Sequence, residues 1–469
     1  MIATPQRRRL RAALVGVAAA AALAAGAGVG VPGTFNAQTA ADEPQYLLSA
    51  ISLFEDGDLD IADELAAQRW RPFHASGLPE QTRPLPGGRR ISPHDPLLPA
   101  LLAVPMALGG WVAAKLTLAG VAAAVAAATL WTAVRRFDVA TGPATLVVAV
   151  FSATSPLAAY GSQVYPELPG ALLTVVAIAA LTPPGPGAAG RQPAAGRSWP
   201  ATAVVGAAVA ALPWLAVKFV PVAAALAVLA LGRLWAGAQR GRALALAALW
   251  ASAGVGYLLA HQAVYGGWTP YASGDHFVGG ELSVVGEQPN YAGRAQRLVG
   301  LVVDRRFGLA AWQPAWLLAI PAVGALARRR PPGWAVLGLP LAAGWLTATF
   351  VALTMQGFWF PGRQVVVVLP AAVLAVAWWA GRVPAARAAV AVTGLIGLWS
   401  YGWLVADGLR GRITWVVNIW QVADPWYGLW ARVLPDYLLP TRWTGVQHAL
   451  WLAAAVVLAL LGARSAARG

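Results

Sequence analysis

Residues 12–32 read AALVGVAAAAALAAGAGVGVP, and residues 41–66 read ADEPQYLLSAISLFEDGDLDIADELA. The first stretch is long and apolar enough to cross a membrane. The second holds eight of the 19 carboxylates in a chain of 469 residues. The chain as a whole is 58% hydrophobic and only 11% charged, whereas a soluble protein has about 25% charged residues. We therefore expect an all-α polytopic membrane protein with an acidic segment directly after its first span.

Apolar windows of the same kind recur along the chain. Windows of about 20 residues predict twelve spans, at residues 12–32, 111–134, 143–161, 168–182, 200–217, 219–236, 243–262, 312–327, 333–353, 364–381, 388–405 and 447–463. Arginines precede the first span, as they do in a cleavable leader. We favour a retained helix, because cleavage would detach the acidic stretch from the membrane and leave an odd number of spans.

The distribution of arginine orients these spans. With the N-terminus inside, the short inner segments are arginine-rich, as the positive-inside rule requires; they contain Arg135, Arg136, Arg191, Arg197, Arg233, Arg240, Arg242, Arg328 to Arg330, Arg382, Arg387, Arg464 and Arg468. On this topology Asp138 is the only acid on the cytoplasmic side. The formal net charge of +15 therefore reflects membrane topology, and no nucleic-acid partner is expected.

Three outer segments, 33–110, 263–311 and 406–446, are too long to be simple connections. We expect two modules: residues 1–235, a catalytic amino-terminal module with the first of these loops, and residues 236–469, a carboxyl-terminal module with the other two.

The first outer segment contains two apolar pieces. Leu47, Leu48, Ile51 and Phe54 recur at helical spacing, which predicts an amphipathic helix lying in the membrane interface. Residues 96–110 are apolar but short and twice interrupted by proline, which favours an interfacial or re-entrant segment over a span.

Charged residues stand at the outer ends of several predicted spans. Asp42 and Glu43 follow the first span, where helix capping is one explanation because a proline comes next. Glu167 opens the fourth span, Lys218 interrupts the apolar run between the fifth and sixth, and Arg363 ends the outer side of the tenth. Snorkelling or interfacial anchoring would explain these three. An ionisable group at the bilayer centre costs about 2.5–3.5 kcal/mol, so each is a candidate functional residue.

Two motifs raise the question of a metal. The run EDGDLD places Asp56, Asp58 and Asp60 at alternate positions, as at the start of a calcium loop. Ile61 stands where that loop needs glycine, and Ala67 stands where it needs a bidentate glutamate, so a solvated turn is the preferred interpretation.

The segment SPHDP offers His94 and Asp95 near Arg90. One histidine and one carboxylate are weak evidence for a metal, and a polar turn explains them nearly as well. The chain has no cysteine and so no disulfide or thiolate site. No cofactor is assigned with certainty, and a divalent metal stays possible.

The Asp-Glu pair after the first span, the amphipathic helix, the HDP turn and the YPELP motif between the third and fourth spans together resemble GT-C glycosyltransferases. The similarity is closest in kind to protein O-mannosyltransferases and the lipid A aminoarabinose transferase. It extends to about Lys218, and in the carboxyl half it rests on the alternation of spans and loops and on the pair Gly362 and Arg363. It implies an inverting transferase that moves a hexosyl or pentosyl group from a polyprenyl phosphate to an envelope glycan, a glycolipid or a protein.

The resemblance also implies residue roles. Asp42 would be the general base that takes the proton of the acceptor hydroxyl, and Glu43 would orient the acceptor or tune the charge. Lys218 and Arg363 would stabilise the leaving phosphate. The residues assigned to substrate binding are Glu167, Lys218, Arg363, His94, Asp95 and Arg90. Polar residues of the second long loop, Tyr271, Asp275, His276, Asp304, Arg305 and Arg306, would suit sugar or phosphate recognition.

We expect a multi-pass protein of the inner (plasma) membrane with its active site on the extracytoplasmic face, in contact with membrane lipids. Two alternatives stay open. A multi-span transporter or lipid flippase would have charges within central spans and helices broken at the midplane. A scaffold that has lost catalysis would keep the same loops without needing Asp42.

Overall fold

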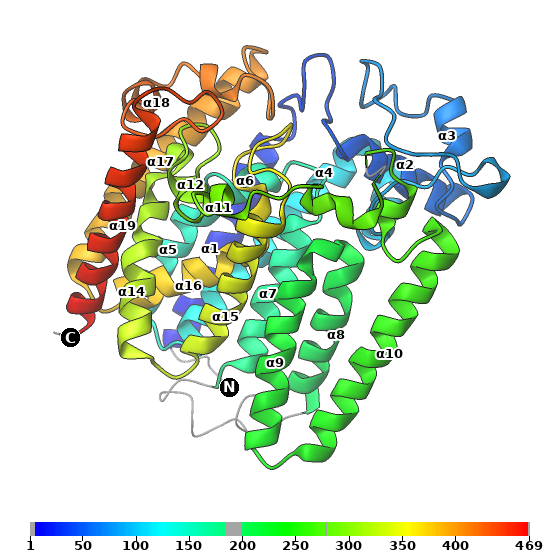
Figure 1. Ribbon diagram of the computed structural model, residues 1–469. Helices are drawn as coiled ribbons and strands as arrows, with labels where there is room; N and C mark the ends of the chain where they lie inside the picture. Colours follow the sequence, from blue (N-terminus) through cyan, green and yellow to red (C-terminus); the bar gives the residue numbers. More distant parts are fainter. Residues whose placement is uncertain (1–4, 184–198, 277–278, 468–469) are drawn as a thin grey trace.

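The computed structural model describes residues 5–183, 199–276 and 279–467. Within these ranges every regular element is a helix and no strand forms (Figure 1). Eight helices of the described chain are long and apolar enough to cross a membrane. They are α1 (Pro5–Ala27), α4 (Leu97–Arg135), α9 (Val220–Ala236), α10 (Arg240–Tyr265), α15 (Trp334–Leu346), α16 (Leu369–Ala380) preceded by η8 (Arg363–Val368), α17 (Pro384–Leu409) and α19 (Thr444–Ala467).

Shorter helices complete the bundle. Three of them are apolar, namely α5 (Thr141–Ser152), α7 (Glu167–Leu181) and α8 (Trp199–Leu215), and α14 (Ala319–Arg329) packs against α19 and α16. Each of the twelve predicted spans thus overlaps a helix, and the chain is a multi-pass membrane protein. The remaining elements are α2 (Glu43–Glu55), α3 (Ala62–Ala66), η1 (Pro86–Gly88), α6 (Leu157–Tyr160), η3 (Val217–Phe219), η4 (Pro270–Ser273), η5 (Glu281–Val285), α11 (Tyr291–Arg294), α12 (Arg297–Val303), α13 (Leu309–Trp312), η6 (Pro314–Leu318), η7 (Thr347–Val351), η9 (Ile419–Gln421) and α18 (Pro425–Trp430).

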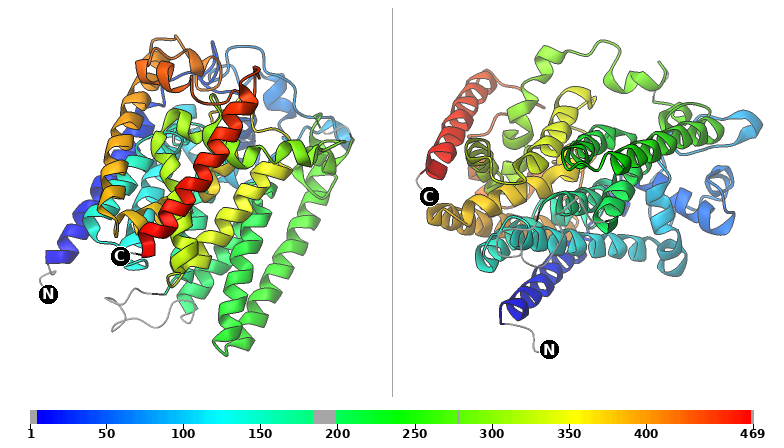
Figure 2. Two further views of the ribbon diagram at one scale, coloured as in Figure 1. Left: turned by 60° about the vertical axis from the view of Figure 1, so that its left-hand side comes forward. Right: turned by 90° about the horizontal axis from the view of Figure 1, so that it is seen from below.

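The short elements gather at one end of the bundle. In Figure 1, α2, α3 and α18 lie at that end, and both chain ends and the turn between α9 and α10 lie at the other. Figure 2 shows α1 (blue) and α19 (red) at separate edges of the molecule. The predicted inner residues Arg191, Arg197 and Arg468 lie outside the described residues.

The core of the bundle is formed by α16, which is buried along its whole length. It packs against α5, α14 and α17 and against α4 and α7. Helices from the two sides of residue 235 are in contact, since α9 packs on α15 and α7 on η8. The division into two modules at that residue stays a prediction.

The segment before the second span, which we expect to be interfacial or re-entrant, is helical, and its position relative to the membrane stays a prediction. Residues 97–108 form the first part of α4, with Pro105 inside the helix. The interruption comes instead at Gly109 and Gly110, where Gly110 has φ 61° and ψ −158°. That backbone conformation is open essentially to glycine alone, so the glycine pair bends the helix where the prolines do not.

The helix α2 was predicted to lie in the membrane interface, and the structure places it inside the protein. Leu47 and Leu48 are fully buried, and its polar residues Gln45, Ser49 and Ser52 are buried as well. The covering element is α4, against which α2 packs. The predicted span at 143–161 is also interrupted, because α5 ends at Ser152 and a separate short helix, α6, begins after Pro156.

Candidate active site

Four charged side chains meet at the end of the bundle that carries α2, and each lies at a helix end or between two helices. Asp42 is the N-cap residue of α2, and Glu167 is the first residue of α7. Lys218 lies in η3, between α8 and α9, and Arg363 begins η8. Residues up to 321 positions apart in sequence therefore form one cluster, which we call the Arg363 cluster.

Arg363 joins the two acids of this cluster. Its Nη2 donates to Asp42 Oδ2 at 2.6 Å, and its Nε donates to Glu167 Oε1 at 3.0 Å. The same Glu167 oxygen accepts from Lys218 Nζ at 2.6 Å. Two cations and two carboxylates therefore lie in direct contact, and their formal charges cancel.

The local sequence fixes the position of the arginine. Gly362, the residue before it, has φ 87°, and a Cβ there would come within 2.7 Å of Leu309 Cδ2. The guanidinium lies 4.1 Å from the ring centroid of Tyr165, a geometry suited to a cation–π contact. The Arg363 side chain is 8% exposed, whereas those of Asp42 and Lys218 are 25% and 24% exposed. A ligand can therefore reach the acid and the lysine from outside.

His94 also borders the acid. Its Nε2 lies 3.7 Å from Asp42 Oδ2, its Nδ1 lies 2.8 Å from Ser92 Oγ, and its ring packs against Tyr46. Burial by itself would raise the pKa of Asp42, but the Arg363 charge and the His94 contact outweigh it and hold that pKa well below its ordinary 3.8. Asp42 is therefore ionised at neutral pH, and it is a weak base as long as Arg363 stays in contact.

Glu43, the sequence neighbour of Asp42, points elsewhere. It is fully buried, and its two oxygens accept from the backbone N–H groups of Ala40 (3.1 Å) and Val164 (2.8 Å). Burial raises the pKa of Glu43, although the Lys115 charge and both N–H donors act in the opposite direction. The carboxylate thus ties the start of α2 to the segment that leads into α7, and the structure places it outside the Arg363 cluster.

Asp95 likewise points away from the Arg363 cluster. Its Oδ1 accepts from Tyr257 Oη at 2.7 Å and lies 3.0 Å from His261 Nε2, and its Oδ2 accepts from the backbone N–H of Val217 at 2.8 Å. It therefore connects α10 to η3, the element that holds Lys218. His261 was not predicted, although a lone histidine near the outer end of an apolar run is a visible signal.

Arg90 and the tip of the second long loop also lie outside the Arg363 cluster. Arg90 pairs with Glu80 and donates to the backbone oxygen of Thr82. Asp275 pairs with its neighbour His276, and its backbone N–H donates to Gln81 O. The second loop thus packs on the first.

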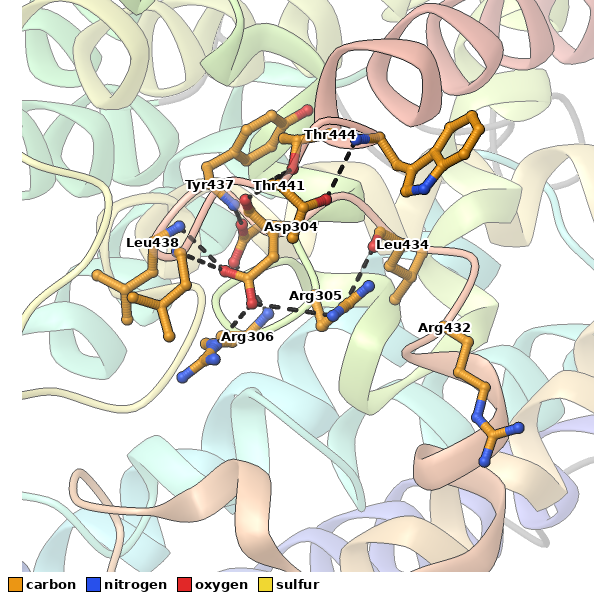
Figure 3. A network of polar contacts seen from close by, with 12 residues as sticks. Asp304, Arg305, Arg306, Arg432, Leu434, Tyr437, Leu438, Thr441 and Thr444 are labelled. Carbon is orange, nitrogen blue, oxygen red and sulfur yellow. Dashed lines mark hydrogen bonds and ion pairs between the residues drawn. The ribbon is translucent and has the colours of Figure 1, made fainter.

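Asp304 and Asp436 link the second and third long loops, and Figure 3 shows Asp304 among the surrounding polar contacts. Asp304 is fully buried and accepts from the backbone N–H groups of Arg306, Phe307 and Tyr437 at 2.6 to 3.0 Å. Arg306 Nε donates to Asp436 Oδ2 at 3.0 Å, and Arg305 Nη1 lies 4.0 Å from the same oxygen. We call this arrangement the loop clasp. The polar residues predicted for sugar or phosphate recognition at 304–306 are engaged in it.

An apolar groove of about 480 Å³ lies between α8, α9 and α10. Its lining includes Trp214, Trp250 and Trp268, and also Val217 and Val220 on either side of Lys218 in sequence. Lys218 itself is not among the residues that line the groove, and its Nζ is directed at Glu167.

No protein-family model and no curated protein matches this sequence. A solved structure does: ArnT from Cupriavidus metallidurans, bound to undecaprenyl phosphate. The match has a TM-score of 0.53 at 15% sequence identity, and it covers 97% of this chain and 73% of that one. The two proteins share a fold. The expected all-α polytopic membrane fold is thereby confirmed, and the similarity to ArnT extends over nearly the whole chain rather than over its amino half alone.

Proposed function

We propose that this protein is an integral membrane inverting glycosyltransferase, which transfers a sugar from a polyprenyl-phosphate donor to an acceptor on the extracytoplasmic side of the plasma membrane. The observation that carries the proposal is the Arg363 cluster at the end of a membrane bundle, in which the partly exposed Asp42 contacts Arg363, while Arg363 and Lys218 share the buried Glu167. The fold similarity supports it, because ArnT binds undecaprenyl phosphate.

The donor would occupy two regions. Its prenyl chain would lie in the apolar groove between α8, α9 and α10, and its phosphate would reach Lys218 and Arg363. Arginine binds phosphate oxygens with bidentate geometry, and a lysine adds a point charge. Once Arg363 turns from Asp42 to the phosphate, the pKa of Asp42 rises, because its closest cation has gone.

The chemistry then follows from the residues in place. The acceptor hydroxyl attacks the anomeric carbon of the sugar, and its proton passes to a carboxylate oxygen of Asp42. The bond between the anomeric carbon and the phosphate oxygen breaks, and its electron pair leaves with the prenyl phosphate. Attack opposite the leaving group inverts the anomeric configuration. A positioned base contributes about 10² to 10⁴-fold to such a rate.

The test is mass spectrometry of polyprenyl-phosphate sugars and envelope glycans in cells that lack the gene. These cells are complemented either with the wild-type gene or with the Asp42→Asn variant, and the two strains are compared. We expect one lipid-linked sugar to accumulate on deletion, one glycan product to disappear, and only wild type to restore both. Equal complementation by Asp42→Asn would remove Asp42 from the chemistry. Unchanged lipids and glycans on deletion would favour the transporter or scaffold instead.

A further inference from the structure

Three carboxylates converge at the far end of α2, away from the Arg363 cluster. Asp56 caps the C-terminus of α2, and Asp63 and Glu64 come from α3. One oxygen from each lies within 4.8 Å of the others, which is close enough to share a metal ion. This is the one such group of three or more ligand-type residues in the described chain.

Glu64 supplies the second observation. Its side chain is only 2% exposed, and its Oε2 has no hydrogen-bond partner among the described residues. An ionised carboxylate with a dry, unpaired oxygen costs several kcal/mol, so such groups are normally paired or bound to a metal.

The charge of Arg69 acts on Asp56 and Glu64, but among the described residues its side chain forms no hydrogen bond to the three acids. The nearby Arg69 directs both of its terminal nitrogens at Glu55, at 2.8 and 2.6 Å. A carboxylate at a helix C-terminus such as Asp56 is also disfavoured by the helix dipole. A bound cation would relieve both the repulsion among the acids and this unfavourable interaction.

The other acids of the EDGDLD run are already engaged. Asp58 Oδ1 accepts from Ser52 Oγ and from the backbone N–H of Asp60. Asp60 Oδ1 accepts from the backbone N–H groups of Ala62 and Arg90. Asp58 and Asp60 therefore stabilise a turn, as predicted. Of the three aspartates in the EDGDLD run, only Asp56 is directed to Asp63 and Glu64.

We propose that Asp56, Asp63 and Glu64 form a calcium site that fastens the end of α2 to α3. Carboxylate oxygens without nitrogen or sulfur ligands suit a hard cation. Calcium accepts irregular oxygen geometry, and the exposed Asp56 and Asp63 leave room for the waters that complete its shell. Affinities of extracellular calcium modules, about 10⁻⁴ to 10⁻³ M, set the expected range. Asp42 caps the opposite end of α2. A bound ion would therefore also restrict the motion of the helix that carries Asp42.

The test does not depend on the transferase proposal, because it measures binding and unfolding rather than activity. Full-length protein in chelator-treated detergent buffer is titrated with CaCl₂ by calorimetry and by thermal unfolding. We expect one site per chain and a Tm that rises and saturates with Ca²⁺. Asp63→Asn and Glu64→Gln should each weaken binding at least tenfold. Glu287→Gln, which removes an exposed acid of another loop, should bind like wild type.

A second readout separates a metal site from a pair of acids that share a proton. Without calcium, Glu64→Gln should melt no lower than wild type, because it removes repulsion, yet it should lose the calcium-dependent rise. An absent Tm shift in wild type up to about 10 mM Ca²⁺, or an equal shift in Glu64→Gln, would overturn the proposal. If Glu64→Gln does not fold, the exposed Asp63→Asn decides in the same way.

Discussion

At the scale of single residues, the main feature is one arginine shared by two carboxylates. Arg363 could hold Asp42 and Glu167 at once because a guanidinium donates from several directions in one plane. The resting charge balance has a chemical consequence: Asp42 becomes more basic only when its partner moves. A donor phosphate is the kind of ligand that would move it.

Glu167 is the residue whose neutralisation should be most informative. We expect Glu167→Gln to lower transfer activity by about 10² to 10³-fold, the range for removing one preorganised electrostatic group, because Lys218 and Arg363 then lose their common anion. Glycan transfer by purified protein checks this. Glu55→Gln, which breaks an exposed pair with Arg69, is the matched control and should keep near wild-type activity, since such pairs contribute about 0–1 kcal/mol. Equal losses in both variants would contradict the specific role of Glu167.

Asp304 should make the loop clasp sensitive to pH. Burial outweighs its three N–H donors and raises its pKa to about 6, from an ordinary value of 3.8. The folded state therefore holds the proton more tightly than the unfolded state, so the contribution of this group is full below pH 3.8 and is lost as pH rises through 6. We expect the Tm advantage of wild type over Asp304→Asn to be larger at pH 4 than at pH 7. A difference that is constant with pH would show that Asp304 does not titrate in this range.

At the scale of elements, the contact between α14 and α19 depends on a glycine in each helix. A Cβ on Gly324 of α14 would overlap Ala459 O of α19, and a Cβ on Gly462 of α19 would overlap Pro321 O of α14. The two backbones therefore touch directly, as small residues allow in membrane bundles.

This contact predicts a clear contrast within one helix. Gly462→Ala should force α14 and α19 apart and lower the Tm of the protein in detergent by several degrees. Gly445→Ala, in the same helix, meets no atom within 4 Å and should leave the Tm unchanged or slightly raised, since alanine favours a helix. An unchanged Tm in Gly462→Ala would contradict direct contact between the backbones of α14 and α19.

At the scale of the whole molecule, the short elements α2, α3 and α18 gather at one end of the bundle, and the turn between α9 and α10 lies at the other (Figure 1). The proposed function needs the cluster on the extracytoplasmic side, which the arginine distribution predicts.

The absence of cysteine from the sequence makes this sidedness measurable. A cysteine at exposed Ala67, in the first outer segment, should react with a membrane-impermeant maleimide in intact cells. One at exposed Ala236, at the end of α9, should react only after permeabilisation. The reverse pattern would place the cluster in the cytoplasm and would exclude an extracytoplasmic acceptor.

The sequence by itself determined the class of fold and the span ends at which the ionisable residues lie. A backbone in hydrocarbon must satisfy its own hydrogen bonds, so apolar runs of about 20 residues become helices whatever their context. The twelve predicted spans overlap helices for this reason. Asp42, Glu167, Lys218 and Arg363 could be selected in the same way, because ionisable groups at span ends are costly and few.

Only the tertiary structure decided which side chains face one another. Asp42 and Glu43 are neighbours in sequence, as are His94 and Asp95, and in each pair one side chain borders the Arg363 cluster while the other bonds elsewhere. Successive side chains in a helix lie about 100° apart, which separates Asp42 from Glu43 at the start of α2. His94 and Asp95 lie outside any helix, at a bend of the chain that directs them apart. The environment of α2 was also decided by the tertiary structure. Its apolar spacing fits contact with either lipid or protein, and in the folded chain α4 covers its apolar face.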